Sequence, residues 1–285
     1  MICLEKRKES QLITLEERIF SLLASIIGIL ITIICLYPIF YVLIVSVSKP
    51  FYVENGDVMF WVKGFTLESY KQAFAKDGLW LAYLNTFFYT IFGVIANMFF
   101  TTTMAYALSK EKLVFRKFFT FLVVFTMWFN AGMIPLYMTF VDLNLLNTRT
   151  SIIIGFAINT YNLIILKSFF EQVPPSLEEA AVIDGASNFQ IFRKVFLPLS
   201  KPALATVGMF YCVNRWNGYF WAMNLLKDDS KIPLQVLLKK LIVDQVANET
   251  EAGIVTMDSL ASQTTIIYAI IIIAIIPMTI AYPFV

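Results

Sequence analysis

Residues 177–202 read LEEAAVIDGASNFQIFRKVFLPLSKP, a charged segment set between two long apolar runs. Pro174 and Pro175, just upstream, cannot continue the helix before them and push the chain into an extended turn. Ser176 followed by Glu179 predicts that a new helix begins here with a capping box. The charged segment is therefore expected to open with a short helix that does not belong to the apolar runs.

The second half of the segment predicts another short helix. Asp184 and Gly185 should end the first one, because glycine adopts the left-handed conformation that closes a helix. Ser187 and Gln190 form a second capping box, after which phenylalanines recur at helical spacing. Two interpretations stay open: an amphipathic helix on the membrane surface, and a docking helix for a cytoplasmic partner. The small residues of EEAAVIDG, which would let another protein approach closely, favour docking.

The composition of the whole chain indicates an integral membrane protein. Of its 285 residues, 59% are hydrophobic and only 15% are charged. Histidine is absent, which excludes His general bases, imidazole metal ligands and Ser-His-Asp or Cys-His nucleophiles. Cys3, Cys35 and Cys212 have no metal-ligand spacing and do not support a disulfide framework. We therefore expect no catalysis, metal or cofactor on this chain. The net charge of +2 does not indicate nucleic acid, and no nucleic-acid partner is expected.

Six apolar runs are long enough to cross about 30 Å of hydrocarbon. They are residues 19–47, 81–108, 118–140, 151–170, 202–225 and 265–284. The first run follows a charged head, residues 1–18, and is too long and lacks the small-residue cleavage site for a removable signal peptide. We predict an all-α membrane protein with six transmembrane helices. Residues 19–285 should form one transmembrane domain, with residues 171–201 as the loop between helices four and five.

Lysine and arginine in the short loops predict the orientation. They gather before the first span, between the second and third spans, and in the charged segment: Lys6, Arg7, Lys8, Arg18, Lys110, Lys112, Arg116, Lys117, Arg193, Lys194 and Lys201. These three places share one side of a six-span chain, which should be the cytoplasm because short cytoplasmic loops carry an excess of basic residues. Both termini are therefore predicted inside, and the long loops 48–80 and 223–264 outside.

Polar and aromatic side chains in the apolar runs are candidates for a solute pathway, because polar groups are costly in lipid and tend to face a wet cavity. The candidates are Trp128, Asn130, Asn159, Asn162, Tyr211, Asn214, Arg215 and Asn217. Amides and aromatic faces suit a sugar, whose hydroxyls need hydrogen bonds and whose C–H faces stack on rings. Structural roles stay open as well: Arg215 could pair internally or snorkel, and the asparagines could join helix to helix.

At the charged segment the sequence resembles the membrane-spanning subunits of bacterial binding-protein-dependent ABC importers. Their hallmark is a cytoplasmic loop reading EAA, three residues, G, nine residues, an aliphatic residue, any residue and LP. The matching residues are Glu179, Ala180, Ala181, Gly185, Val195, Leu197 and Pro198, with valine where isoleucine is commonest. CLYPIFYVLIVSVSKP, GFTLESYKQAF, SFFEQVPPSLEEAA and WNGYF are similar to the carbohydrate-uptake branch, in the second membrane subunit of maltose-type importers. Such subunits usually continue into a short polar tail, and this sequence stops at Val285.

The resemblance implies a function and a set of partners. The chain would form half of the translocation pathway of an ATP-driven carbohydrate importer, for an oligosaccharide, in the bacterial plasma membrane. It would work with a second homologous permease subunit, two ATP-binding subunits and an extracellular solute-binding protein, and it would contact membrane lipid. The chain has no GxxxxGK[ST] sequence, so ATP and Mg²⁺ are expected on the partners.

The resemblance also implies which residues meet the ATPase. The first short helix would be a coupling helix seated in a groove on that subunit, with Glu179 facing a basic residue there. The implied coupling residues are Glu178, Glu179, Ala180, Ala181, Asp184, Gly185, Leu197 and Pro198. An importer for another small polar solute, an ion-coupled secondary transporter and a membrane scaffold or sensor stay open. A secondary transporter would usually show an intramembrane carboxylate, and no acidic residue lies well within a predicted span.

Overall fold

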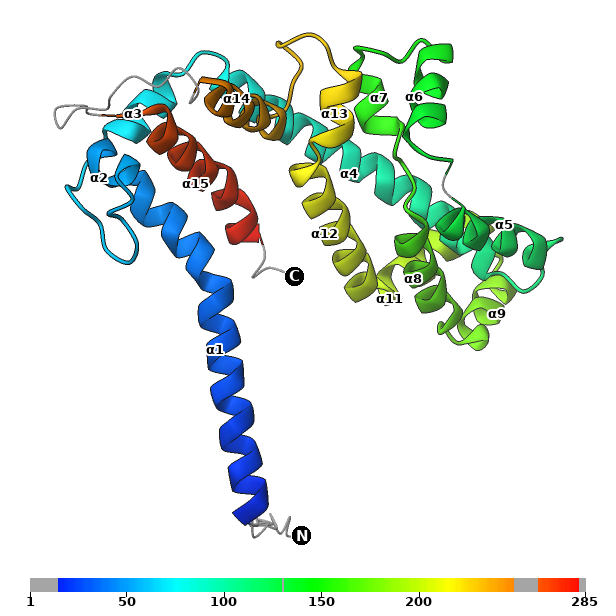
Figure 1. Ribbon diagram of the computed structural model, residues 1–285. Coiled ribbons are helices and arrows are strands. Elements are labelled where there is room, and N and C mark those ends of the chain that lie inside the picture. The colour runs from blue at the N-terminus through cyan, green and yellow to red at the C-terminus, as the bar shows by residue number, and fades with distance from the viewer. Residues whose placement is uncertain (1–14, 130, 249–260, 282–285) are drawn as a thin grey trace.

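The computed structural model describes residues 15–129, 131–248 and 261–281, and every regular element among them is helical (Figure 1). The prediction of an all-helical chain is confirmed for this part. Residues 1–14, with most of the predicted charged head, lie outside the described residues. So do Asn130, residues 249–260 of the second long loop, and the end of the last predicted span at residues 282–285.

Three helices are long and apolar enough to cross a membrane: α1 (Leu15–Ser46), α4 (Leu79–Ser109) and α15 (Gln263–Ala281). They correspond to the first, second and sixth predicted spans. Residues 18–40 of α1 are exposed on all sides and extend away from the other helices, whereas its C-terminal turns pack on α15 (Figure 1). A helix that is hydrophobic all round needs an apolar surrounding, so α1 requires lipid or another membrane helix.

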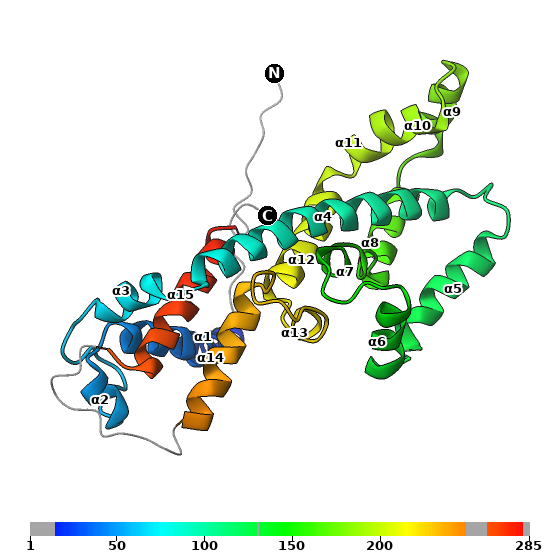
Figure 2. The same cartoon turned by 90° about the horizontal axis from the view of Figure 1, so that it is seen from above.

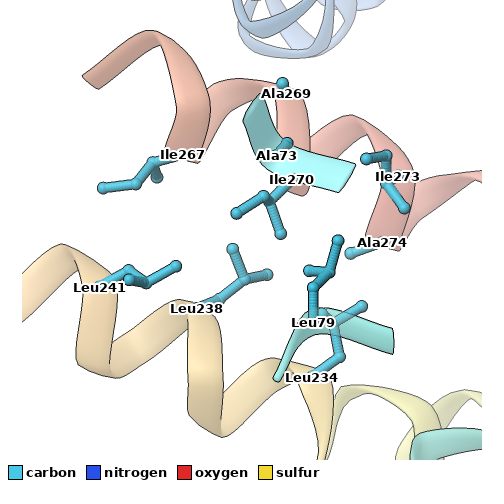
Figure 3. Packing of buried hydrophobic residues seen from close by; sticks show 10 residues of the cluster. All are labelled: Ala73, Leu79, Leu234, Leu238, Leu241, Ile267, Ala269, Ile270, Ile273 and Ala274. Carbon is cyan, nitrogen blue, oxygen red and sulfur yellow. The ribbon is translucent and has the colours of Figure 1, made fainter. Parts of the chain in front are cut away.

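The N-terminal ends of α4 and α15 are held together by a compact apolar cluster (Figure 3). Here α14 (Leu234–Asn248) places Leu234, Leu238 and Leu241 at helical spacing against α15. From the other side, α15 contributes Ile267 and Ile270. Two short helices of the first long loop, α2 (Pro50–Glu54) and α3 (Glu68–Ala75), also pack on α15. The two long loops are therefore partly folded into helices that brace the ends of the spans.

Three predicted spans are not single helices in the structure. The third is divided into α5 (Arg116–Trp128) and α6 (Met133–Asp142). The fourth is divided into α7 (Arg149–Ile154) and α8 (Thr160–Glu171), and the fifth into α12 (Lys201–Asn217) and α13 (Phe220–Leu225). The sequence predicts the break in the third span, where Asn130 and Gly132 stand before the helix-kinking Pro135. It does not predict the breaks in the fourth and fifth, because an apolar run shows that a segment can lie in the membrane and not that its helix is continuous. The bent pair α5 and α6 passes the same length and apolarity test when taken as one span.

The charged segment folds as two short helices and a turn, as predicted. The first is α9 (Pro175–Ile183), and Gly185 follows it with φ of 77°. The second begins as α10 (Asn188–Ile191), and its predicted capping box is present: Ser187 N–H donates to Gln190 Oε1 at 2.8 Å. It continues through the π-helical turn η1 (Phe192–Phe196) and α11 (Leu197–Leu199) into α12.

The capping box predicted at Ser176 is wrong. The helix begins one residue earlier, at Pro175, and its N-cap is Pro174, which offers no side-chain acceptor. Proline is well suited to the first helical position because its missing N–H has no partner there in any case. The prolines therefore set the start of α9, and Ser176 falls inside it.

Figure 2 shows how α4 connects the two ends of the molecule. Its N-terminal half lies beside α14 and α3, and its C-terminal half packs on α8 and α12. The charged segment, α9 to α11, lies near the C-terminal end of α4, while α13 and α7 lie near its middle. The single helix α4 thus lies beside both the charged segment and the helices that carry the predicted pathway residues.

Candidate functional site

A cavity of about 840 Å³ lies where α12 ends and α13 begins. Its walls come from α4, the α7–α8 connection, α8, α12 and α13. Six of the predicted pathway residues line it: Asn159, Asn162, Tyr211, Asn214, Arg215 and Asn217. The structure therefore brings together residues from two predicted spans, the fourth and the fifth, that are separated in the sequence by residues 171–201. Of the other two candidates, Trp128 lies at the end of α5, 86% exposed and away from this cavity, and Asn130 is outside the described residues.

Arg215 closes one wall of the cavity through hydrogen bonds to backbone. Its Nη2 donates to the carbonyl oxygens of Ile153 at 3.0 Å and Phe156 at 2.9 Å, and its Nη1 donates to that of Ile152. These carbonyls belong to the last turn of α7 and to the connection after it. Free carbonyls at a helix end carry partial negative charge, so a guanidinium is well placed there. Of the alternatives left open for Arg215, internal pairing is the one found.

Asn97 of α4 completes the same network. Its Oδ1 accepts from Arg215 Nε at 2.8 Å, and its Nδ2 donates to the carbonyl oxygens of Phe156 and Ala157, both at 2.8 Å. The side chain is fully buried. Backbone polar groups at membrane depth must be satisfied by protein or water, and side chains do this at the break between α7 and α8. The network therefore explains how the fourth predicted span can be interrupted.

Sequence reasoning missed Asn97. The signal was present, because an amide within an apolar run is as informative there as the asparagines of the other runs. Its partner lies 118 positions away, so the pairing itself could not be predicted from one sequence.

Gly93 makes room for Arg215 on α4. A methyl group at this position would lie 2.9 Å from Arg215 Nε and 3.0 Å from its Cδ. Contacts below 3.0 Å essentially do not occur for a real Cβ, so a larger residue would displace the guanidinium from its carbonyl partners. The glycine is therefore part of the same network, through close approach rather than through backbone conformation.

Tyr211 fixes the start of α8 on the other side of the cavity. Its hydroxyl lies 2.7 Å from Thr101 Oγ1 and accepts from the backbone N–H of Asn159 at 3.0 Å. Asn159 in turn caps α8, because its Oδ1 accepts from the N–H of Asn162 at 3.1 Å. Tyr211 is only 3% exposed, so it holds the wall rather than presenting a surface to a solute.

Asn214 and Asn217 have a different character from Arg215 and Tyr211. Both line the cavity and are exposed, and neither side-chain amide has a hydrogen-bond partner in the part of the chain that is described. Tyr219, Phe220 and Trp221 lie beside them in the lining. Free amides next to aromatic rings can bond hydroxyl groups and stack on apolar ring faces. No acidic residue is among the described lining residues, so the cavity carries the single positive charge of Arg215.

The predicted coupling residues lie at the C-terminal end of α4, and three of them pack inward. Glu178 Oε2 forms an ion pair with Lys110 Nζ at 2.7 Å, just after the end of α4. The Lys110 ammonium also lies 4.0 Å from the ring centroid of Phe196 and 4.2 Å from that of Tyr106. Ala181 packs on the buried cluster that includes Phe196, and so does Leu197. These contacts attach the charged segment to α4.

The opposite side of α9 is exposed and mixed in character. Glu179, Ala180 and Asp184 are exposed there, and Ile183 is 85% exposed. Pro198 is exposed on α11. Gly185 has open space around it, so its requirement for glycine is the positive φ alone. The arrangement offers an apolar and acidic surface of small residues that another protein could contact closely.

Comparison with known proteins identifies relatives over nearly the whole chain. Residues 77–285 match the family described as binding-protein-dependent transport system inner membrane component. The polygalacturonan/rhamnogalacturonan transport system permease protein YtcP of Bacillus subtilis (strain 168) is 37% identical over 95% of both chains. Protein LplC of the same organism is 37% identical over 88% of this chain and 85% of its own.

One solved structure is similar over the same extent. It is a crystal structure of a bacterial ABC transporter involved in the import of the acidic polysaccharide alginate. The similar chain has a TM-score of 0.86 and 42% sequence identity, covering 95% of this chain and 96% of that one.

Proposed function

This chain belongs to the family of binding-protein-dependent transport system inner membrane components, and on that premise we propose that it forms half of the pathway of an ATP-driven carbohydrate importer. Members of this family are multi-pass permeases of the plasma membrane rather than enzymes. The solute proposed is an oligosaccharide. The relatives named for polygalacturonan, rhamnogalacturonan and alginate support that class, because their similarity to this chain extends over 95% of it.

The observation that carries the proposal is the lining of the larger cavity. Unpaired amides of Asn214 and Asn217 stand beside aromatic rings, in a volume of about 840 Å³. Sugars present hydroxyl groups at their edges and C–H groups on their faces, which match amides and rings respectively. Small-molecule sites usually occupy about 300–1,000 Å³, so the cavity is of suitable size. Trp128 and Asn130 are proposed to line the pathway elsewhere, on the side where α5 ends.

We propose a topology of six crossings with both termini in the cytoplasm. In it, α5 with α6, α7 with α8, and α12 with α13 each make one interrupted crossing. Residues 1–18 would be cytoplasmic, residues 19–285 would form the transmembrane domain, and residues 171–201 would be the coupling loop. The clustering of basic residues near α9 supports this orientation.

We propose that the exposed surface of α9 docks on an ATP-binding subunit. Glu179, Ala180 and Asp184 would contact it directly, while Glu178 and Ala181 hold α9 on α4. Two such subunits would bind ATP and Mg²⁺, a second permease would complete the pathway, and a solute-binding protein would deliver the sugar from outside. The resemblance of EAA, G and LP at matching spacing supports this assignment.

Reconstitution tests the function directly. The chain is co-purified with its partners, placed in proteoliposomes with ATP inside, and supplied outside with the binding protein and labelled oligogalacturonides. We expect accumulation that needs ATP and the binding protein. Accumulation driven by an ion gradient without ATP would contradict the proposal, and ATP-dependent uptake of a non-carbohydrate solute alone would contradict the solute class.

A further inference from the structure

A second cavity, of about 410 Å³, lies between the N-terminal half of α5 and the C-terminal half of α8. It is lined by Arg116, Lys117, Thr120, Phe121, Val124 and Lys167. It shares no residue with the larger cavity, and neither the solute pathway nor the coupling surface explains it. Three of its six lining residues are cationic.

The positive charge in this cavity is only partly balanced. Arg116 and Lys167 both pair with the same carboxylate oxygen, Glu171 Oε1, and the Lys167 Nζ lies 2.7 Å from it. Lys117 forms no ion pair with any described residue. Three cations therefore face one carboxylate, which leaves an excess of two positive charges. Such an excess at an open groove favours an anionic ligand.

The rest of the lining changes from polar to apolar along α5. Thr120 adds a hydroxyl one turn after the basic pair, and Phe121 and Val124 follow on the same side. At 1.5 Å per residue, Val124 lies about 12 Å along the helix axis from Arg116. No side chain of α5 is buried within the described chain, and Phe121 is 62% exposed, so this face is open to its surroundings. The site has a cationic end and an apolar end, so it is complementary to an amphiphile with an anionic headgroup.

We propose that this cavity binds an anionic phospholipid of the cytoplasmic leaflet. The phosphate lies among Lys117, Lys167 and the Thr120 hydroxyl, and an acyl chain runs along Phe121 and Val124. Basic pockets between membrane helices on the cytoplasmic side recognise lipid headgroups in this way. The assignment rests on the proposed orientation, which places the start of α5 on the cytoplasmic side.

Lipid binding is tested on the purified, assembled transporter by native mass spectrometry. Phosphatidylglycerol is titrated and compared with phosphatidylcholine of the same acyl chains. Lys117→Gln removes the unpaired cation, and we expect it to weaken phosphatidylglycerol binding about fivefold, since a basic residue near an anionic headgroup contributes a factor of that size. Lys112→Gln is the matched control: it removes the same charge from an exposed position in the connection that precedes α5, outside the cavity. It should leave binding unchanged.

Three results would overturn the lipid assignment. They are equal weakening by Lys117→Gln and Lys112→Gln, equal binding of phosphatidylcholine, and displacement of the lipid by soluble glycerol phosphate at matched concentration. Orientation is checked separately by labelling Lys112→Cys with an impermeant thiol reagent from each side of sealed vesicles. Labelling from outside alone would contradict the proposed topology. If the reconstituted transporter takes up no carbohydrate with ATP but still binds phosphatidylglycerol, only the proposed function is contradicted.

Discussion

The charged segment and the larger cavity are built in different ways. In the charged segment, the contacts that set the helix ends join residues three positions apart, such as Ser187 and Gln190. In the cavity, Arg215 reaches Asn97 over 118 positions, and Tyr211 reaches Thr101 over 110. The helix ends of the charged segment therefore follow from local sequence, whereas the cavity wall exists only after four helices have come together.

This difference predicts two kinds of mutational effect. The exposed side of α9 has no partner that the folded chain needs, so changes there should alter coupling and leave stability intact. The cavity network satisfies backbone carbonyls, those of Ile152 and Ile153, for which the described residues offer no other donor, so changes there should destabilise the fold. Each of the following variants tests one side of this contrast, from the largest expected effect to the smallest.

Replacement of Arg215 by methionine should have the largest effect. It leaves the carbonyls of Ile152 and Ile153 without donors and removes the partner of Asn97 Oδ1. Unsatisfied buried groups cost about 1–3 kcal/mol each, so we expect a loss of about 3 kcal/mol or more and little folded protein. Arg215→Lys should recover only part of this, because an ammonium cannot reproduce the planar set of donors. Thermal unfolding in detergent measures the change, and an unfolding temperature like that of the parent for Arg215→Met would contradict the structural role.

Glu179→Lys should lower transport strongly without lowering stability. The side chain is exposed on α9, so reversal of its charge should leave folding and membrane insertion unchanged. Uptake into proteoliposomes should fall at least about tenfold while ATP hydrolysis by the partners continues, as expected when charge complementarity at an interface is reversed. Glu111→Lys is the matched control, with the same charge change at an exposed position on the same side. Parent-like uptake by Glu179→Lys, or equal loss in both variants, would remove the case for a coupling surface here.

Gly93→Ala tests the close approach of α4 to Arg215. The added methyl would lie 2.9 Å from Arg215 Nε, and overpacking of this kind costs about 1–3 kcal/mol. Gly208→Ala is the control, because its methyl would meet only Met98 Sδ at an ordinary 3.8 Å. Unfolding temperature should fall for the first variant and stay near that of the parent for the second. Equal behaviour of the two would show that the guanidinium can move without cost.

The same contrast explains what the sequence could predict. Caps, the stop at Gly185 and the matching EAA pattern are local, so the charged segment could be predicted almost completely, apart from the misplaced box at Ser176. Asn214 and Asn217 could be identified because polar groups in apolar runs are conspicuous. The break in the third span is indicated by Pro135, whereas the break in the fourth could not be predicted, since its free carbonyls are satisfied by Asn97 on another helix. The ion pair of Glu178 with Lys110 could not be predicted either, because the sequence around each residue contains no pattern that specifies its partner.

Asn214→Ala tests whether residues that stabilise the fold and residues that act only in transport lie in separate regions, or side by side in the cavity. Asn214 lines the cavity, as Arg215 does, yet its amide has no partner within the described chain. If its task is to bond a sugar hydroxyl, its removal should cost about 1 kcal/mol of solute binding, a roughly fivefold rise in the concentration for half-maximal uptake. Unfolding temperature should not change, and Asn217→Ala should behave alike. A fall as large as that of Gly93→Ala would place Asn214 in the structural network. With the expected result, the cavity is lined both by residues that stabilise the fold and by residues that bind the solute. What distinguishes the solute-binding residues is then the lack of a hydrogen-bond partner within the described chain, and not their position.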